Sequence, residues 1–219
     1  MEDTVVVEDL LPQGLHLLVG APKIGKSWLS LWLCLRVVQG ETLWSFTTKP
    51  CKVLYLCLED SFQRIQSRLL DLSEDAPSAL HFAVMSEQLH AGLVEQMEQF
   101  LREHPATGLA VIDTLQRIRT VGNEINPYAS DYRDIDVLKA LADRHRIAIL
   151  LIHHLGKLSG EDPMNMISGT TGLGGATDSN FVPERASAER TPLSSPLLTS
   201  CREQYGEDPI RIKPRRCIM

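Results

Sequence analysis

The chain has 219 residues, a net charge of −6 and 43% hydrophobic residues, which is ordinary for a soluble protein of one domain, with or without a tail. This charge gives no general attraction to nucleic acid, so any such binding must come from a local basic patch. The five cysteines lack the spacing of metal ligands or of a disulfide framework, and the most apolar run has 11 residues where a membrane-spanning helix needs about 20, so we expect a cytoplasmic protein with no membrane partner.

The first predicted strand, residues 15–20, leads directly into the segment Gly20-Ala-Pro-Lys-Ile-Gly-Lys-Ser27. A glycine, four residues and then Gly-Lys-Ser is the spacing of a phosphate-binding loop (P-loop), and an apolar helix at 27–39 follows it, as the motif requires. Gly20 and Gly25 let the backbone curl so that amide groups converge on phosphate oxygens. The alternative is a tight turn with a capping serine.

In a P-loop the lysine reaches the β- and γ-phosphates, and the serine hydroxyl is a ligand of Mg²⁺. These roles fall on Lys26 and Ser27, and the N-terminal end of the helix adds its partial positive charge. ATP and Mg²⁺ are therefore the expected ligands. The residues expected to contact the nucleotide are Gly20, Ala21, Pro22, Lys23, Ile24, Gly25, Lys26, Ser27 and Trp28.

The second predicted strand, residues 53–58, is followed by Glu59, Asp60 and Ser61. In α/β proteins the ligand site lies at the carboxyl ends of the strands. Glu59 is therefore a candidate for the base that activates water during hydrolysis. The alternative is that these three residues only cap the following helix.

A third strand at 80–85 and an amphipathic helix at 91–104 lead to the fourth strand, residues 108–113, which ends at Asp113. A carboxylate in this position can hold the Mg²⁺ shell, although a lone aspartate after a strand is more often a helix cap. The segment 114–131 has no periodic pattern. A loop of this length is often functional.

An amphipathic helix at 132–145 precedes the fifth strand, residues 147–152, and the chain then continues with His153 and His154. A polar side chain here could contact the γ-phosphate and report its loss to the loop behind it, 155–178, which belongs to a long loop predicted at 153–178. Zinc binding is the alternative interpretation. It is disfavoured because adjacent histidines on an extended chain point to opposite sides, and no cysteine or further histidine lies nearby.

All five apolar runs are nearly continuous rather than alternating, as in parallel strands that are covered on both faces. Strands that alternate with helices predict an α/β fold with a mostly parallel sheet flanked by helices on both faces. The last residues, 183–219, are rich in proline, serine and arginine and have little periodic pattern. We therefore expect a domain at 1–182 and an irregular or truncated C-terminal tail at 183–219.

The order of the P-loop, Glu59, Asp113 and then His-His-x-x-Lys resembles that of RecA-like ATPases. It is more closely similar to the RepA-type branch, which is related to the hexameric replicative helicases of the DnaB type. The most specific part of this likeness is DPMNMISGTTGLGGATDSNFV at 162–182, and the whole likeness covers roughly 8–182. The resemblance implies a RecA-like P-loop core that binds ATP between adjacent subunits of a ring or filament. It also implies that the histidine strand lies between the P-loop strand and the Asp113 strand.

Carried over by position, the resemblance implies that Glu59 activates water and that Lys26 binds the phosphates. Ser27 and Asp113 are then the Mg²⁺ residues, with Asp113 acting through water. His154 resembles the γ-phosphate sensor of this group, and His153 is the second choice for that role.

The resemblance also implies homo-oligomers, with a hexameric ring as one form, and single-stranded DNA as a partner. The loops at 114–131 and 155–175 correspond to regions that face the central channel in such assemblies. Arg117, Arg119 and Lys157 are the resulting candidates for DNA contacts. The alternative is that they are ordinary solvated charges on loops.

After Phe181 the sequence departs from its relatives, which continue with strands whose basic residues complete the ATP site of the neighbour. No such strand pattern is evident here, and a tail altered by truncation or a shifted reading frame is one hypothesis, which sequencing the locus would test. The arginine finger would then be Arg185, Arg190 or Arg202, which the sequence does not rank.

The expected function is that of an ATP-hydrolysing motor or helicase component in the replication of a plasmid, phage or mobile element. One alternative is a KaiC-type or recombination-accessory switch, in which ATP controls assembly without unwinding. Another is a nucleotide-binding module whose turnover is impaired by the altered C-terminus. A nucleoside or shikimate-type kinase fits less well, because no arginine-rich lid is evident.

Overall fold

The computed structural model of the protein describes residues 5–119, 127–154, 173–185 and 210–216. Within these ranges the chain forms a seven-stranded sheet in the order β5-β4-β6-β7-β3-β8-β9, together with a small β1-β2 ribbon. The first six strands of the large sheet are parallel, and β9 pairs antiparallel with β8. The strands are β1 (Val5–Val7), β2 (Leu11–Pro12), β3 (Gly14–Gly20), β4 (Lys52–Cys57), β5 (Leu80–Ala83), β6 (Thr107–Asp113), β7 (Ala148–His154), β8 (Ser179–Arg185) and β9 (Ile210–Arg216).

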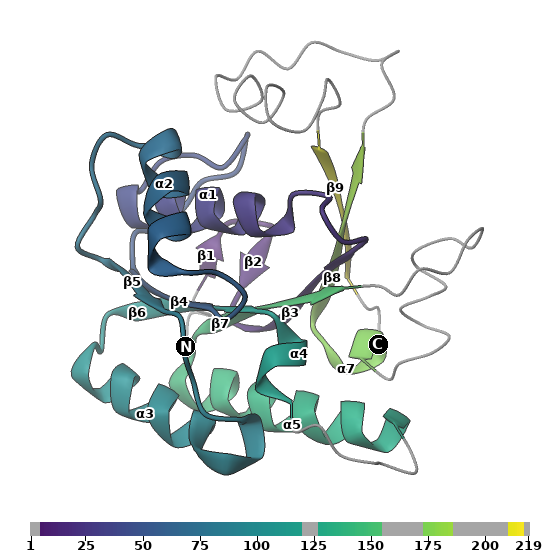
Figure 1. Ribbon diagram of the computed structural model, residues 1–219. Coiled ribbons are helices and arrows are strands. Elements are labelled where there is room, and N and C mark those ends of the chain that lie inside the picture. Colours follow the sequence, from purple (N-terminus) through teal and green to yellow (C-terminus); the bar gives the residue numbers. More distant parts are fainter. Residues whose placement is uncertain (1–4, 120–126, 155–172, 186–209, 217–219) are drawn as a thin grey trace.

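Helices cover both faces of the sheet (Figure 1). Helices α1 (Lys26–Gln39) and α2 (Phe62–Leu72) lie on one face, while α3 (Val94–Glu103) and α5 (Pro127–His145) lie on the other. The shorter helical elements are α4 (Leu115–Ile118), α7 (Leu173–Ala176) and a π-helical turn at Leu89–Leu93. The predicted fold class, an α/β fold with a mostly parallel sheet and a helical layer on each side, is confirmed.

Alternate side chains of the central strands enter two separate cores, because successive residues of a strand point to opposite faces. On β4, Val53 and Tyr55 pack toward α1 and α2, while Leu54 and Leu56 pack toward α3 and α5. Burial on both faces explains why the strands read as continuous apolar runs. The five predicted strands all form, and β7 lies between β3 and β6 as the resemblance implied.

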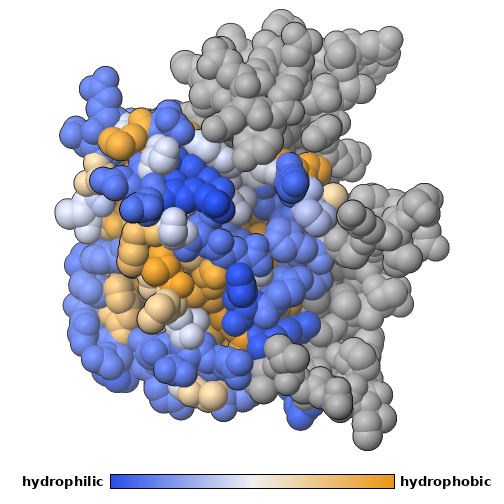
Figure 2. Space-filling view, viewed as in Figure 1, coloured by the Kyte–Doolittle hydropathy of each residue, from blue (hydrophilic) through white to orange (hydrophobic). Residues whose placement is uncertain are grey.

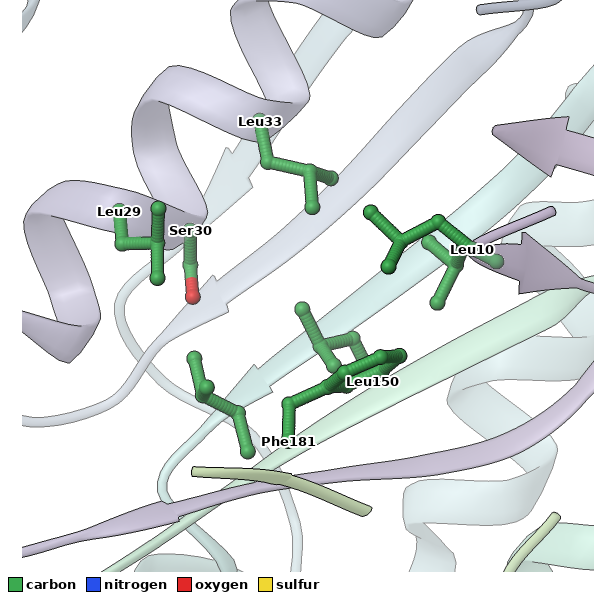
Figure 3. Close-up of a pocket in the computed structure, with 8 residues that line it drawn as sticks. Leu10, Leu29, Ser30, Leu33, Leu150 and Phe181 are labelled. Atoms are coloured by element: carbon green, nitrogen blue, oxygen red, sulfur yellow. The ribbon is translucent and has the colours of Figure 1, made fainter. Parts of the chain in front are cut away.

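Helix α1 packs on the sheet around a cavity of about 20 Å³ (Figure 3). Its only polar lining side chain is Ser30, whose hydroxyl has no hydrogen-bond partner within the described ranges. The remaining lining residues are Leu10, Leu11, Leu18, Leu29, Leu33, Leu150 and Phe181. This space is much too small for a nucleotide, so it belongs to the core that anchors α1.

The prediction of an unstructured loop at 114–131 is wrong at both of its ends. Helix α4 forms because Leu115 and Ile118, three residues apart, share one face that is fully buried. Helix α5 begins at Pro127 rather than at 132, and proline is well suited to the first turn of a helix because its missing N–H needs no partner there. Residues 120–126 lie outside the described part of the chain.

The predicted loop at 153–178 also begins and ends with regular structure, because β7 continues through His154 and α7 occupies Leu173–Ala176. The prediction of an irregular tail is wrong for 183–185 and 210–216, which belong to β8 and β9. Pro183 and Pro214 weaken the strand pattern of these stretches. The sheet tolerates them because Pro214 is in the edge strand β9 and Pro183 lies beyond the residues through which β8 pairs with β3. The remaining tail, 186–209 and 217–219, lies outside the described residues.

Within the ranges that the structure describes, none of the helices combines the length and the apolar character needed to cross a bilayer.

Candidate functional site

The carboxyl ends of β3, β4, β6 and β7 lie at the same edge of the sheet, and residues at the ends of β3, β4 and β7 line a cleft of about 460 Å³. The register of the parallel strands places Asp113 opposite Cys57 and His154 opposite Gly20. The residues that line the cleft are Pro22, Lys23, Gly25, Lys26, Ser27, Trp28, Glu59, Asp60, Arg64, Arg68 and His154. Segments that are far apart in the sequence thus supply one site.

A second cleft, of about 280 Å³, lies between the sheet and α3. Its lining includes Leu54, Leu56, Met85, Met97 and Phe100, and Figure 2 shows apolar side chains gathered on this face of the molecule within a polar surround. None of the described residues that line it is a lysine or an arginine. The first cleft is therefore the better candidate for a phosphate-containing ligand.

The P-loop geometry depends on two glycines. Gly25 is the N-cap of α1 with a φ of 96°, a left-handed conformation that other residues adopt at a cost. At Gly20, a Cβ atom would lie 3.3 Å from Cγ2 of Ile24 and 3.4 Å from Cγ of Pro183. The loop therefore turns tightly against β8 before α1 begins at Lys26.

Lys26 is buried inside the loop that it follows, with 3% of its surface exposed. Its Nζ donates hydrogen bonds to the carbonyl oxygens of Gly20 at 2.8 Å and Ala21 at 2.9 Å. Burial lowers the pKa of Lys26 to about 8, although the nearby carboxylates of Asp113 and Glu59 oppose that shift. The ammonium group is thus held in the cleft by two carbonyl groups.

Asp113 is the buried carboxylate of the site, with 4% of its surface exposed. Burial raises its pKa, and hydrogen bonds from the side chains of Ser27 and Tyr55 counteract that rise. The hydroxyl group of Ser27 and the carboxylate of Asp113 therefore lie side by side. Hydroxyl and carboxylate oxygens are the ligands that Mg²⁺ prefers, so this donor set fits the expected ion.

Glu59 lies at the open side of the cleft, with 40% of its side chain exposed. Its Oε1 accepts a hydrogen bond from Oγ1 of Thr114 at 3.0 Å, and its Oε2 lies 3.4 Å from Nε2 of His154. Nε of Arg117 lies 3.9 Å from the same Oε1. The carboxylate is therefore surrounded by hydrogen-bond donors and remains accessible to water.

The capping alternative for Glu59 does not hold. Ser61 caps α2, because its Oγ accepts a hydrogen bond from the backbone N–H of Arg64 at 3.4 Å. Asp60 forms ion pairs with Arg64 and Arg68. Glu59 takes part in neither interaction and faces the cleft.

The two histidines at the end of β7 have different surroundings. His154 lines the cleft beside Glu59. Nδ1 of His153 lies 2.8 Å from Nε2 of Gln116 on α4. Burial, with the nearby charge of Arg119 as the next cause, lowers the pKa of His153 to about 4, so this ring is neutral near pH 7. His154 is therefore the better placed of the two to contact a ligand.

Comparison with known proteins identifies the family. A family model described as an AAA domain matches residues 3–160. The chain belongs to the AAA domain family. A solved structure titled "ATPase Domain of G40P" has a TM-score of 0.62 and 13% sequence identity, and the alignment covers 92% of this chain and 80% of that chain. At this identity the likeness shows the fold alone, and the comparison with curated proteins gives no match.

The arginine residues that follow β6 in this AAA domain differ in their contacts. Nε of Arg119 lies 2.8 Å from Oδ2 of Asp134, a carboxylate on α5 that is 4% exposed, so Arg119 is anchored to the helical layer. Arg117 is 59% exposed and lies beside Glu59. Lys157 lies outside the described residues.

Of the three arginine-finger candidates, only Arg185 lies within the described residues. The backbone of Arg185 ends β8, whereas Arg190 and Arg202 lie outside the described ranges. Two residues that contact the candidate site residues are not predicted by the sequence analysis: Tyr55, which contacts Asp113, and Thr114, which contacts Glu59. A tyrosine within an otherwise apolar strand was the available signal for Tyr55, and nothing comparable points to Thr114.

Proposed function

We propose that this AAA domain binds ATP with Mg²⁺ in the P-loop cleft and hydrolyses it as a RepA-type motor or helicase component in plasmid, phage or mobile-element replication. The observation that carries the proposal is that Lys26 and Glu59 line one cleft, while Asp113 is hydrogen-bonded to Ser27, which lines the same cleft. These residues supply a buried cation, a buried carboxylate and an accessible carboxylate, which are the groups that phosphoryl transfer to water needs.

The P-loop side of the cleft holds the nucleotide in this proposal. Backbone amides between Gly20 and Ser27 and the N-terminal end of α1 face the phosphates, and Lys26 supplies a positive charge. Ser27, together with Asp113 through water, would hold Mg²⁺, and the bound ion would neutralise the charge that develops on the phosphate oxygens. Lys26 exchanges its bonds to the carbonyl groups of Gly20 and Ala21 for bonds to phosphate oxygens.

Glu59 is the general base in this proposal. Its carboxylate accepts a proton from water, which reaches it because the side chain is 40% exposed. His154 contacts Glu59 and ends β7, so it is placed to respond when the γ-phosphate leaves. Assembly into a ring or another homo-oligomer, and contact with single-stranded DNA through the segments 114–131 and 155–175, are part of the same proposal.

The test combines ATP turnover with mass in solution, each measured with and without single-stranded DNA. A motor should hydrolyse ATP faster when DNA is added, with an affinity for DNA that falls steeply as salt rises. The mass should increase with ATP. Turnover that DNA leaves unchanged, together with ATP-dependent assembly, would instead identify a switch.

The switch alternative has one observation in its favour, because Arg119, a candidate DNA contact, pairs with Asp134 within the domain. Binding of ATP without turnover at any protein concentration would leave only the nucleotide-binding module.

A further inference from the structure

The hydroxyl group of Thr114 makes an unusual contact for a threonine that begins a helix. It is the N-cap residue of α4, with φ −131° and ψ 168°, and it is fully buried. A threonine at an N-cap normally accepts a hydrogen bond from a backbone N–H in the first turn of its helix. Here the side chain makes no such bond. Its hydroxyl group therefore serves something other than the helix that it begins.

The hydroxyl group of Thr114 donates instead to Oε1 of Glu59, at 3.0 Å. The two residues come from different strand ends, and the pairing of β4 with β6 brings them together. The backbone N–H of Leu58 donates to the carbonyl oxygen of Asp113 at 2.8 Å, which extends the ladder by one residue beyond the strands. The contact is thus fixed by the register of the sheet.

This contact distinguishes the two oxygens of the Glu59 carboxylate. Oε1 is held by Thr114, whereas Oε2 lies 3.4 Å from Nε2 of His154, a residue that lines the cleft. A glutamate with an exposed side chain samples several rotamers, and ordering it has an entropic cost. A donor that is itself immobile because it is buried removes much of that freedom before any ligand arrives.

We infer that Thr114 is a positioning residue that fixes the rotamer of Glu59, so that Oε2 is the oxygen that meets the attacking water. This inference rests on the proposed function, in which Glu59 accepts the proton of that water. Thr114 is not among the cleft-lining residues. Its loss should therefore reduce the rate of the chemical step without weakening the binding of nucleotide.

The experiment compares Thr114→Val, Thr114→Ala and Thr114→Ser with the wild type. It measures the rate of ATP turnover, the affinity for a fluorescent ATP analogue and the temperature of thermal unfolding. Valine removes the hydroxyl and keeps the shape, alanine gives the same test in a smaller side chain, and serine restores the donor. We expect kcat to fall about 10- to 100-fold in the valine and alanine variants, with KM and nucleotide affinity within about threefold of the wild type. Serine should restore kcat to within about threefold of the wild type.

The matched control is Thr107→Val. Thr107 is a buried threonine at the opposite end of the same strand, where its Oγ1 donates to the carbonyl oxygen of His104 at 2.8 Å. This variant should lose stability and keep its kcat.

Three results would overturn the inference: a kcat of Thr114→Ala equal to that of the wild type, a loss in Thr114→Ser as large as in Thr114→Ala, or a loss confined to nucleotide affinity. A failure of the proposed function looks different, because then the wild-type protein itself would not hydrolyse ATP or Glu59→Gln would hydrolyse it normally.

Discussion

The hydroxyl group of Tyr55 lies 3.1 Å from Oδ2 of Asp113 and 3.3 Å from the carbonyl oxygen of Ser27. Tyr55 belongs to β4, Asp113 ends β6, and Ser27 lies in the first turn of α1. One buried hydroxyl therefore connects two neighbouring strands with the start of the P-loop helix. The carboxylate that is expected to act at Mg²⁺ is held in place by a residue that does not line the cleft.

Replacing Tyr55 with phenylalanine should destabilise the domain by about 1 to 3 kcal/mol, because the buried carboxylate of Asp113 loses a hydrogen-bond donor. The same change should raise the pKa of Asp113 further above its ordinary value, since the Tyr55 bond lowers it. Urea denaturation at pH 7 measures the free energy of unfolding. An unchanged midpoint and slope would show that this hydroxyl contributes nothing to the native state.

Ser30→Ala should stabilise the domain. The Ser30 hydroxyl is buried against an apolar cavity with no partner among the described residues, and an unsatisfied buried hydroxyl costs about 1 to 3 kcal/mol. The matched control is Ser67→Ala, an exposed serine within α2, which should gain only about 0.5 kcal/mol from helix propensity. Equal gains in the two variants would mean that the Ser30 hydroxyl is satisfied in solution.

His153→Gln should weaken the pH dependence of stability in the acidic range. The pKa of His153 is about 4 in the folded protein and 6.5 as its ordinary value, so the unfolded chain binds more protons between these values and stability falls as pH drops from 6.5 to 4. Because water still reaches part of the ring, we expect the variant to recover about 1 to 2 kcal/mol at pH 4 relative to the wild type. The buried ring of His16 acts in the same direction in both proteins, so the difference between the two urea titrations isolates His153.

Glu59→Gln should retain ATP binding and lose hydrolysis. Because a glutamine cannot accept the proton of water, kcat should fall by about 10² to 10⁴. Single-turnover measurements separate this loss from an effect on binding. Glu74→Gln, at an exposed position beyond α2, is the control and should hydrolyse ATP at the wild-type rate. Normal hydrolysis by Glu59→Gln would assign the base to another residue.

The P-loop and the strand ends could be predicted because their signals are local. All seven residues of β3 are buried, so this strand is visible in the sequence as a nearly continuous apolar run. The glycines that follow have the spacing of a P-loop, which can also be recognised without knowledge of distant contacts. The positions of Lys26, Glu59 and His154 around one cleft, with Asp113 beside Ser27, follow from that prediction once the strands are known to be parallel.

The remaining features depend on register and on distant partners. Thr114 and Glu59 are 55 residues apart, and only the pairing of β4 with β6 shows that they touch. Strand β9 pairs with β8 across 24 residues outside the described ranges, and proline in each strand masks the pattern. The sequence does not reveal the start of α5 at Pro127, because the periodic apolar pattern begins only later in the helix.

The most direct test of the account is a calorimetric titration of the protein with ATP and Mg²⁺, repeated with Lys26→Ala and with Lys49→Ala, an exposed lysine that does not line the cleft. The account predicts saturable binding by the wild type and by Lys49→Ala. It also predicts at least a roughly tenfold weaker affinity in Lys26→Ala, because a charge-assisted hydrogen bond to phosphate is lost. Equal affinities for the wild type and Lys26→Ala, or no binding by the wild type, would contradict it.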